Sequence, residues 1–122
     1  MGYVIIKQDP DRDEYILWSD FTDTPIAVGT RVEMIPYVDQ VDPPRETPGG
    51  TAARFDRADR QGSSMIPYSH GWWDDERMIY EQRGWLRREH IAEACRLRLS
   101  GREVEVWDLL EPFDDETEVR RG

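Results

Sequence analysis

The residue types of acyl-transfer catalysis lie close together in one stretch of the sequence, "SSMIPYSHGWWDDE", residues 63–76. Ser69, His70 and Asp74 could act there as the nucleophile, the base and the orienting acid of a small hydrolase. The sequence has no Gly-x-Ser-x-Gly nucleophile elbow, and no donors for an oxyanion can be assigned. A hydrolase is therefore the alternative interpretation. No glycine-rich phosphate loop is present, and we expect no cofactor.

The acidic connector "DPDRDE" resembles the start of a calcium-binding loop, with Asp9, Asp11 and Asp13 at alternate positions. An EF-hand loop requires a glycine at its sixth position and a bidentate glutamate at its twelfth. Glu14 and Asp20 occupy those two positions here. We therefore expect a solvated turn between two strands.

His90 and Glu93 form a second candidate metal pair, three residues apart on a predicted helix. Ala94 stands where the metalloprotease pattern H-x-x-E-H needs its second histidine. The whole chain has 2 histidines and 1 cysteine, too few for a dedicated zinc site. Cys95 lies on the apolar stripe of the same helix and is expected in the core. We expect no bound metal.

Trp72 and Trp73 are adjacent in a segment rich in bulky and acidic residues. On an extended chain neighbouring side chains point to opposite sides, which predicts one buried tryptophan and one exposed anchor. The alternative is that loops wrap both rings around the core. Tryptophan, tyrosine and arginine dominate interface hot spots. The predicted binding residues are Tyr68, Trp72, Trp73, Asp74, Asp75, Arg77, Glu111, Asp114 and Asp115.

The elements that must position these residues begin with two predicted strands, at about 2–8 and 14–20, rich in Tyr, Val and Ile. Thr30 and Glu33 have capping-box spacing, which favours a short helix at about 31–40. Pro36 would kink that helix, and the alternation of apolar residues keeps a strand as the competitor. A helix at about 52–60 is predicted next, with Thr51 as its N-cap and Gly62 at its end.

The second half of the sequence is less regular. Residues 76–83 could form a helix or a strand, and the apolar run Met78 to Tyr80 favours the strand. The strongest helix pattern is at about 87–99, followed by Gly101. In "EVEVWDLL", alternation predicts a strand with Val104 and Val106 directed inward. Together these elements predict an α+β domain, with short helices packed on a small, mostly antiparallel sheet.

Length and composition set the broad class. A chain of 122 residues is expected to form one domain over about 1–110, followed by an acidic, partly frayed tail at 111–122, apart from Phe113. A single cysteine gives no intramolecular disulfide, and no early apolar run is long enough for a signal peptide or membrane span. We therefore expect a cytoplasmic protein without membrane contact. The sequence leaves homo-oligomers possible.

The net charge of −10 opposes direct binding of nucleic acids. Arginines dominate between Arg77 and Arg102, whereas residues 103–118 contain acids and no base. We expect these two segments to neutralise each other in the fold or to face water. The leading hypothesis is a non-enzymatic module that binds a protein with a basic surface, using acidic steering and a tryptophan anchor. Imitation of nucleic-acid charge by the acidic segment is a special case of this hypothesis.

Three stretches carry a resemblance to other proteins. They are "LWSD" with Pro25 and "GTR" (17–31), "RADRQGSS" (57–64) and "YEQRGWLRREHIAEAC" (80–95). These stretches resemble small uncharacterised proteins encoded by phages and genomes of actinobacteria. One lysine, Lys7, stands against fifteen arginines and no asparagine, which agrees with a GC-rich genome. The resemblance implies an actinobacterial or phage origin and no known activity. With a phage origin, the leading hypothesis becomes a phage-encoded inhibitor or regulator of a host protein in the host cytoplasm.

Overall fold

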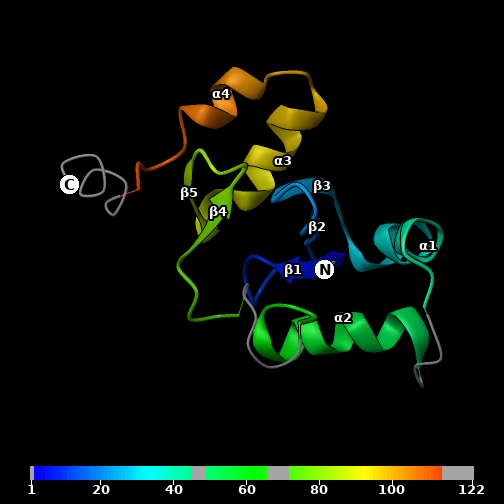
Figure 1. Cartoon of the computed structure of the whole chain (residues 1–122). Coiled ribbons are helices and arrows are strands. Elements are labelled where there is room, and N and C mark those ends of the chain that lie inside the picture. The colour runs from blue at the N-terminus through cyan, green and yellow to red at the C-terminus, as the bar shows by residue number, and fades with distance from the viewer. Residues whose placement is uncertain (1, 45–48, 66–71, 114–122) are drawn as a thin grey trace.

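Three antiparallel strands form the centre of the molecule (Figure 1). The computed structural model describes residues 2–44, 49–65 and 72–113. Strands β1 (Tyr3–Lys7), β2 (Tyr15–Ser19) and β3 (Thr24–Gly29) follow each other as a meander with β2 in the middle. All residues of β2 are buried, since both faces of the sheet are covered. The strands predicted at about 2–8 and 14–20 are confirmed.

Two helices cover one face of this sheet. They are α1 (Arg31–Val41) and α2 (Gly50–Gln61). The period of two in a strand sends alternate side chains of β1 and β2 to this face, where they meet apolar positions of the helices. The buried members of this cluster are Ile5, Tyr15, Leu17, Met34, Val38, Phe55 and Ala58.

Helix α1 confirms the helical interpretation of 31–40. The hydroxyl of Thr30 accepts a hydrogen bond from the Glu33 backbone amide, and the Glu33 carboxylate accepts one from the Thr30 amide, as a capping box requires. Pro36 lies inside the helix and removes the donor that the Val32 carbonyl would otherwise receive. Val32 is 82% exposed, so water can solvate that carbonyl and the helix continues.

Helix α2 begins earlier than the sequence predicts. Its N-cap is Gly49, in the left-handed region with φ 84°, and the assignment of Thr51 as N-cap is wrong. The Thr51 hydroxyl instead donates to Asp39 of α1, which ties the two helices together. Gly62 ends the helix as predicted, with φ 98° and its amide donating to Ala58.

The opposite face of the sheet is covered by a hairpin and two further helices. Strands β4 (Arg77–Tyr80) and β5 (Gly84–Arg87) form a separate antiparallel pair, followed by a 3-10 turn (Arg88–His90), α3 (Ile91–Leu99) and α4 (Glu103–Trp107). The buried members of this second cluster are Val4, Ile6, Ile16, Trp18, Met78, Tyr80, Leu86, Ile91, Ala92, Ala94 and Val106. The described residues thus form an α+β domain with helices on antiparallel sheets, as predicted.

Two predicted boundaries in this half are wrong. The helix expected from residue 87 begins at Ile91, because residues 84–87 pair with β4 as a strand. The strand expected in 103–110 is helix α4, with Val106 buried as predicted but Val104 63% exposed. Helix α4 ends at Trp107, and the turn that follows it brings Leu109 and Leu110 onto the same core as Val106. An extended strand would not place these three side chains together, so tertiary packing outweighs the alternation.

Arg88 joins the covering layers to the sheet. Its guanidinium donates to the backbone carbonyls of Lys7, of Gln8 at 3.2 Å, of Gly62 at 3.1 Å and of Trp72 at 2.7 Å. Burial lowers the pKa of Arg88 below its ordinary value, although the charges of nearby aspartates partly offset this effect. One side chain therefore connects the end of β1, the end of α2 and the segment that leads to β4.

Candidate binding surface

The β4–β5 hairpin carries aromatic and arginine side chains on the face turned away from the core. Strand β4 buries Met78 and Tyr80 and exposes Arg77 and Ile79, which is 37% accessible. The register places Ile79 directly opposite Trp85 of β5, which is half-buried. The alternation of the strand thus separates a core face from an outward face.

Trp85 is held on more than one side before any partner is present. The Arg77 guanidinium lies 4.5 Å from the centre of its ring, and the Phe113 ring meets it edge-on at 5.3 Å. Its backbone exchanges two hydrogen bonds with Glu111, at 2.7 and 2.9 Å. Figure 1 shows the chain passing beside β5 after it leaves α4. The indole is therefore ordered, which reduces the entropy that binding would cost.

Glu111 also compensates a repulsive pair. Arg77 and Arg87 face each other across the hairpin, where like charges destabilise. The Glu111 carboxylate lies 3.5 Å from the Arg77 guanidinium and 3.3 Å from that of Arg87. Other acids of this region also pair with arginines, since Arg98 contacts Glu103 at 3.0 Å. The predicted neutralisation between the basic and the acidic segments is confirmed for these described residues.

A second tryptophan, more exposed than Trp85, lies beside the turn of this hairpin. Trp107 at the end of α4 is 37% exposed, and the Arg83 guanidinium lies 4.0 Å from the centre of its ring. Both residues border a pocket of ≈ 280 Å³ that Leu110 and Glu111 also line. We call the residues of this face the hairpin surface: Arg77, Ile79, Arg83, Trp85 and Trp107.

A groove of ≈ 270 Å³ runs beside β4. Trp18 and Trp85 contribute aromatic walls, and Asp23, Asp75 and Arg77 contribute charge. Apolar walls with a few charged groups are typical of binding sites. The groove therefore adjoins the hairpin surface and shares Arg77, Ile79 and Trp85 with it.

Two strained turns meet at one end of this groove. Among the described residues, the non-glycine positions with positive φ are Asp23 at 55°, Glu81 at 49° and Gln82 at 61°. The Glu81 amide donates to the Asp23 carbonyl at 3.1 Å, and the Gln82 side chain donates to the Asp23 carboxylate at 3.1 Å. The β2–β3 turn and the β4–β5 turn thus hold each other in a conformation that side chains rarely adopt.

A pair of glutamates fixes the same hairpin to α4. Burial, followed by the hydrogen bond and charge of Glu103, raises the pKa of Glu81. Tyr80 donates to Glu103 at 2.8 Å, and Arg98 donates to the same oxygen at 3.0 Å. Burial, followed by the hydrogen bond to Glu103, raises the pKa of Tyr80 as well. Tyr80 stays protonated at neutral pH and serves as a donor.

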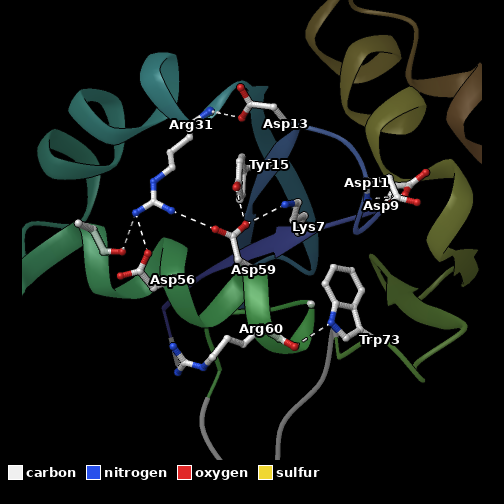
Figure 2. Close-up of polar contacts among 12 residues, drawn as sticks. Lys7, Asp9, Asp11, Asp13, Tyr15, Arg31, Asp56, Asp59, Arg60 and Trp73 are labelled. Atoms are coloured by element: carbon white, nitrogen blue, oxygen red, sulfur yellow. Dashed lines mark hydrogen bonds and ion pairs between the residues drawn. The ribbon is translucent and has the colours of Figure 1, made fainter.

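A polar network on the α2 side is centred on Asp59 (Figure 2). The Asp59 carboxylate accepts from Lys7 at 2.8 Å, from Tyr15 at 2.5 Å and from Arg31 at 3.0 Å. Arg31 also contacts Asp56 at 2.9 Å. Burial and then the hydrogen bond to Asp59 raise the pKa of Tyr15, so this phenol is not poised to act as a base. The network supports the fold.

We expect this network to make stability depend on acid. Burial alone would raise the pKa of Asp59, but hydrogen bonds from Lys7 and Tyr15 and the nearby cations outweigh it and lower the pKa. The resulting stabilisation is present above the unfolded pKa of about 3.9 and is lost as pH falls through the lower folded value. Asp59→Asn should lower the free energy of unfolding by about 1 kcal/mol at pH 7 and by less at pH 2. The loss at pH 7 is small because water screens the partly exposed ion pairs of Asp59.

Urea unfolding at the two pH values measures this difference. The control is Asp56→Asn on the same helix, because Asp56 is 58% exposed and contacts only Arg31 among the described cations. An Asp59→Asn deficit that does not shrink in acid would contradict the assigned role of the carboxylate.

The structure places some of the predicted site residues together. Asp75 and Arg77 line the groove, and Glu111 contacts Arg77 and pairs with Trp85. Asp74 is exposed at the turn before β4. The remaining predicted residues, Tyr68, Ser69, His70, Asp114 and Asp115, lie outside the described residues.

The expectation that one of the adjacent tryptophans is buried and the other exposed is wrong. Trp72 and Trp73 are both half-buried, because they belong to a turn and not to an extended strand. The Asp75 amide donates to the Trp72 carbonyl at 3.0 Å and closes that turn. The Trp73 indole donates to the Arg60 carbonyl at 3.0 Å, and the Arg88 guanidinium lies 4.9 Å from its ring (Figure 2). Trp73 therefore belongs to the Arg88 junction.

The candidate metal ligands are separated or occupied. Asp9 accepts from the Asp11 amide at 2.9 Å, and Asp13 accepts from the Arg31 amide at 3.0 Å (Figure 2). His90 and Glu93 lie 3.5 Å apart on the surface. Within residues 2–44, 49–65 and 72–113, no group of three or more His, Cys, Asp or Glu side chains could hold a metal ion.

Sequence reasoning missed the residues at the centre of the hairpin surface. Trp85, Ile79 and Trp107 were not among the predicted binding residues. The signal for the first two was the spacing of "RMIY" and "GWLR" around the turn residues "EQR", which is a hairpin pattern that pairs Ile79 with Trp85. Trp107 had no comparable signal, because its contact with Arg83 joins two segments that are distant in the sequence.

The comparisons with known proteins return no counterpart: no family description, no curated protein and no solved structure matches this chain. Within the described part of the chain, the helices are too short or too polar to cross a bilayer.

Proposed function

We propose that the protein is a non-enzymatic module that binds another protein through the hairpin surface. The observation that supports this most is Trp85, an indole that is half-buried, stacked against Arg77 and ordered by Glu111 and Phe113. Rigid aromatic residues with adjacent arginines are the typical anchors of protein interfaces. A preformed anchor gains affinity because little motion is lost on binding.

The partner we propose has a basic surface. The chain has a net charge of −10, which would speed the approach of a positively charged protein. Asp23 and Asp75 line the groove, and the exposed Asp74 and Glu76 lie in the segment just before β4. We propose that the protein acts in the cytoplasm, as an inhibitor or regulator of a host protein if it is encoded by a phage. The actinobacterial or phage origin stays a prediction from the sequence.

Site-specific photo-crosslinking tests this proposal. A benzophenone amino acid at position 79 should crosslink one defined protein in a lysate of the source cells. The same group at position 37 is the matched control, because Tyr37 is 40% exposed on α1, on the opposite side of the sheet. Molar salt should weaken the crosslink, since charge steering is screened over about 8 Å at physiological ionic strength and over less at higher salt.

Trp85→Ala should reduce affinity for the crosslinked protein by about 2 kcal/mol or more, or roughly 30-fold. Calorimetry with the purified pair measures the loss, and urea unfolding shows whether the variant remains folded. Equal crosslinking from positions 37 and 79, or full binding by folded Trp85→Ala, would remove the hairpin surface from the proposal.

A further inference from the structure

One edge of β4 has backbone groups that point away from β5. Trp85 exchanges both of its backbone hydrogen bonds with Glu111, so its amide and carbonyl point away from β4. In antiparallel strands the residues of one strand alternate between bonding one side and the other. The neighbours of Trp85 therefore bond to Met78 and Tyr80, and the Arg88 amide continues the same ladder to the Glu76 carbonyl at 2.8 Å.

It follows that the amides and carbonyls of Arg77 and Ile79 face the other side. That side is the groove that Trp18, Asp23 and Asp75 line with β4. The next residue in this row, Glu81, already donates its amide to the Asp23 carbonyl at 3.1 Å. The β2–β3 turn thus closes one end of the edge. Among the described residues no backbone partner bonds the amides of Arg77 and Ile79 on the groove side.

An open strand edge is a template for pairing with another chain, and folded proteins usually cover or shorten it. Here the edge lies in a groove with aromatic walls, which gives side chains of an added strand a place to pack. Adding a strand to such an edge is a known mode of peptide recognition, in which main-chain hydrogen bonds give affinity and pockets give specificity.

Charge selects the occupant of this groove. Asp23 and Asp75 line it, and the exposed Asp74 and Glu76 precede β4. Arg77, the cation in the groove, is already stacked on Trp85 and lies 3.5 Å from the Glu111 carboxylate. A second copy of this chain would bring a further charge of −10, and residues 114–118, which follow Phe113, are mostly acidic. A basic segment fits this charge better than either.

We infer that the open edge of β4 binds an extended peptide segment of the partner that carries lysine or arginine. This inference rests on the proposed function and names the partner's chemistry. The segment would pair with the Arg77 and Ile79 backbone, and alternate side chains would lie in the groove near Asp23 and Asp75.

Amide exchange measured by NMR on the full chain tests the edge first. In the free protein the Ile79 amide should exchange at least tenfold faster than those of Met78 and Tyr80, which the β5 ladder protects. The probe is a capped hexapeptide of alternating valine and lysine. Saturating amounts should slow Ile79 exchange at least tenfold and shift its resonance.

Two control peptides separate charge from strand pairing. A hexapeptide of alternating valine and glutamate should leave the exchange rate and resonance of the Ile79 amide unchanged at the same concentration. A valine–lysine peptide methylated on alternate backbone nitrogens should also fail, because it lacks the donors that pair with an edge. Asp23→Asn should reduce the affinity of the protein for the unmethylated valine–lysine peptide at least fivefold. Asp75→Asn is a second variant at the groove, away from the Asp23–Gln82 contact, with the same expected direction. Glu76→Gln is the control, because Glu76 borders a different pocket beside Arg87 and Arg88 and should leave binding unchanged.

The opposite results would overturn the inference. These are an Ile79 amide already protected in the free protein, equal binding of the lysine and glutamate peptides, or binding of the methylated peptide. Protection of Ile79 that rises with protein concentration alone would assign the edge to a second copy. If the lysine peptide fails while the crosslink from position 79 still depends on Trp85, the proposed function stands and only strand pairing fails.

Discussion

Replacing Arg88 with alanine is expected to lower the free energy of unfolding by about 2–3 kcal/mol, because several backbone carbonyls lose the donor that this half-buried guanidinium supplies. The guanidinium donates to the carbonyls of Lys7, Gln8, Gly62 and Trp72. In the variant the Gly62 carbonyl still accepts from the Lys7 amide, and the Trp72 carbonyl still accepts from the Asp75 amide. The carbonyls of Lys7 and Gln8 lose the hydrogen bond that Arg88 donates. An unpaired buried acceptor costs about 1–3 kcal/mol.

Urea unfolding of Arg88→Ala, Arg88→Lys and Arg87→Ala measures this role. Lysine keeps the charge but not the planar fork that reaches several carbonyls, so Arg88→Lys should lie between wild type and alanine. Arg87 is the matched control, the same residue type one position earlier, whose partly exposed guanidinium contacts the carboxylates of Glu89 and Glu111 and no backbone carbonyl of the junction. Its replacement should leave the unfolding midpoint nearly unchanged. Equal midpoints for the two alanine variants would contradict the junction.

The second large effect is expected for Gly62→Ala at the same junction. Gly62 has φ 98°, and an added Cβ would lie 2.8 Å from the Trp73 backbone nitrogen and 2.7 Å from the Arg88 guanidinium. The backbone strain alone costs about 1–2 kcal/mol. Because the Trp73 contact is with backbone, the segment before β4 must shift, and overpacking of this kind adds about 1–3 kcal/mol.

Gly101→Ala is the control that isolates the contact. Gly101 has φ 76°, and an added Cβ there would meet nothing within 4 Å. The free energy of unfolding of this variant should therefore fall only by the backbone-strain part, about 1–2 kcal/mol. Thermal unfolding of both variants gives the difference. If Gly62→Ala destabilises the protein no more than Gly101→Ala does, the segment that contains Trp73 is free to move.

The fold was predictable where local chemistry and tertiary packing agree. The capping box at Thr30 predicts α1, and Gly62 predicts the end of α2. The prediction failed where packing decides between two patterns. Val104 and Val106 alternate as in a strand, yet α4 and the turn after it bring Val106, Leu109 and Leu110 onto one core. Alternation over four residues is too short a pattern to overrule a core that is already in place.

The candidate site was predicted only in part, for a related reason. Asp75, Arg77 and Glu111 were named because of their type, and the structure places them at the groove or at Trp85. The choice of tryptophan depended on contacts that sequence spacing does not show. The Trp73 ring contacts the guanidinium of Arg88, which is 15 residues away in the chain. The Trp85 backbone bonds to Glu111, which is 26 residues away. Spacing within one element can predict a face, whereas pairing between distant segments requires the fold.

Cys95 has a practical consequence for every measurement that needs a label. It is the one cysteine of the chain, fully buried in α3, and burial raises the pKa of its thiol to about 12. Thiolates react with maleimides and thiols do not, so the native protein should be nearly silent toward such reagents. A cysteine introduced at position 79 or 107 would then be the site that takes a fluorophore or spin label. The hairpin surface can be followed spectroscopically in an otherwise unaltered chain.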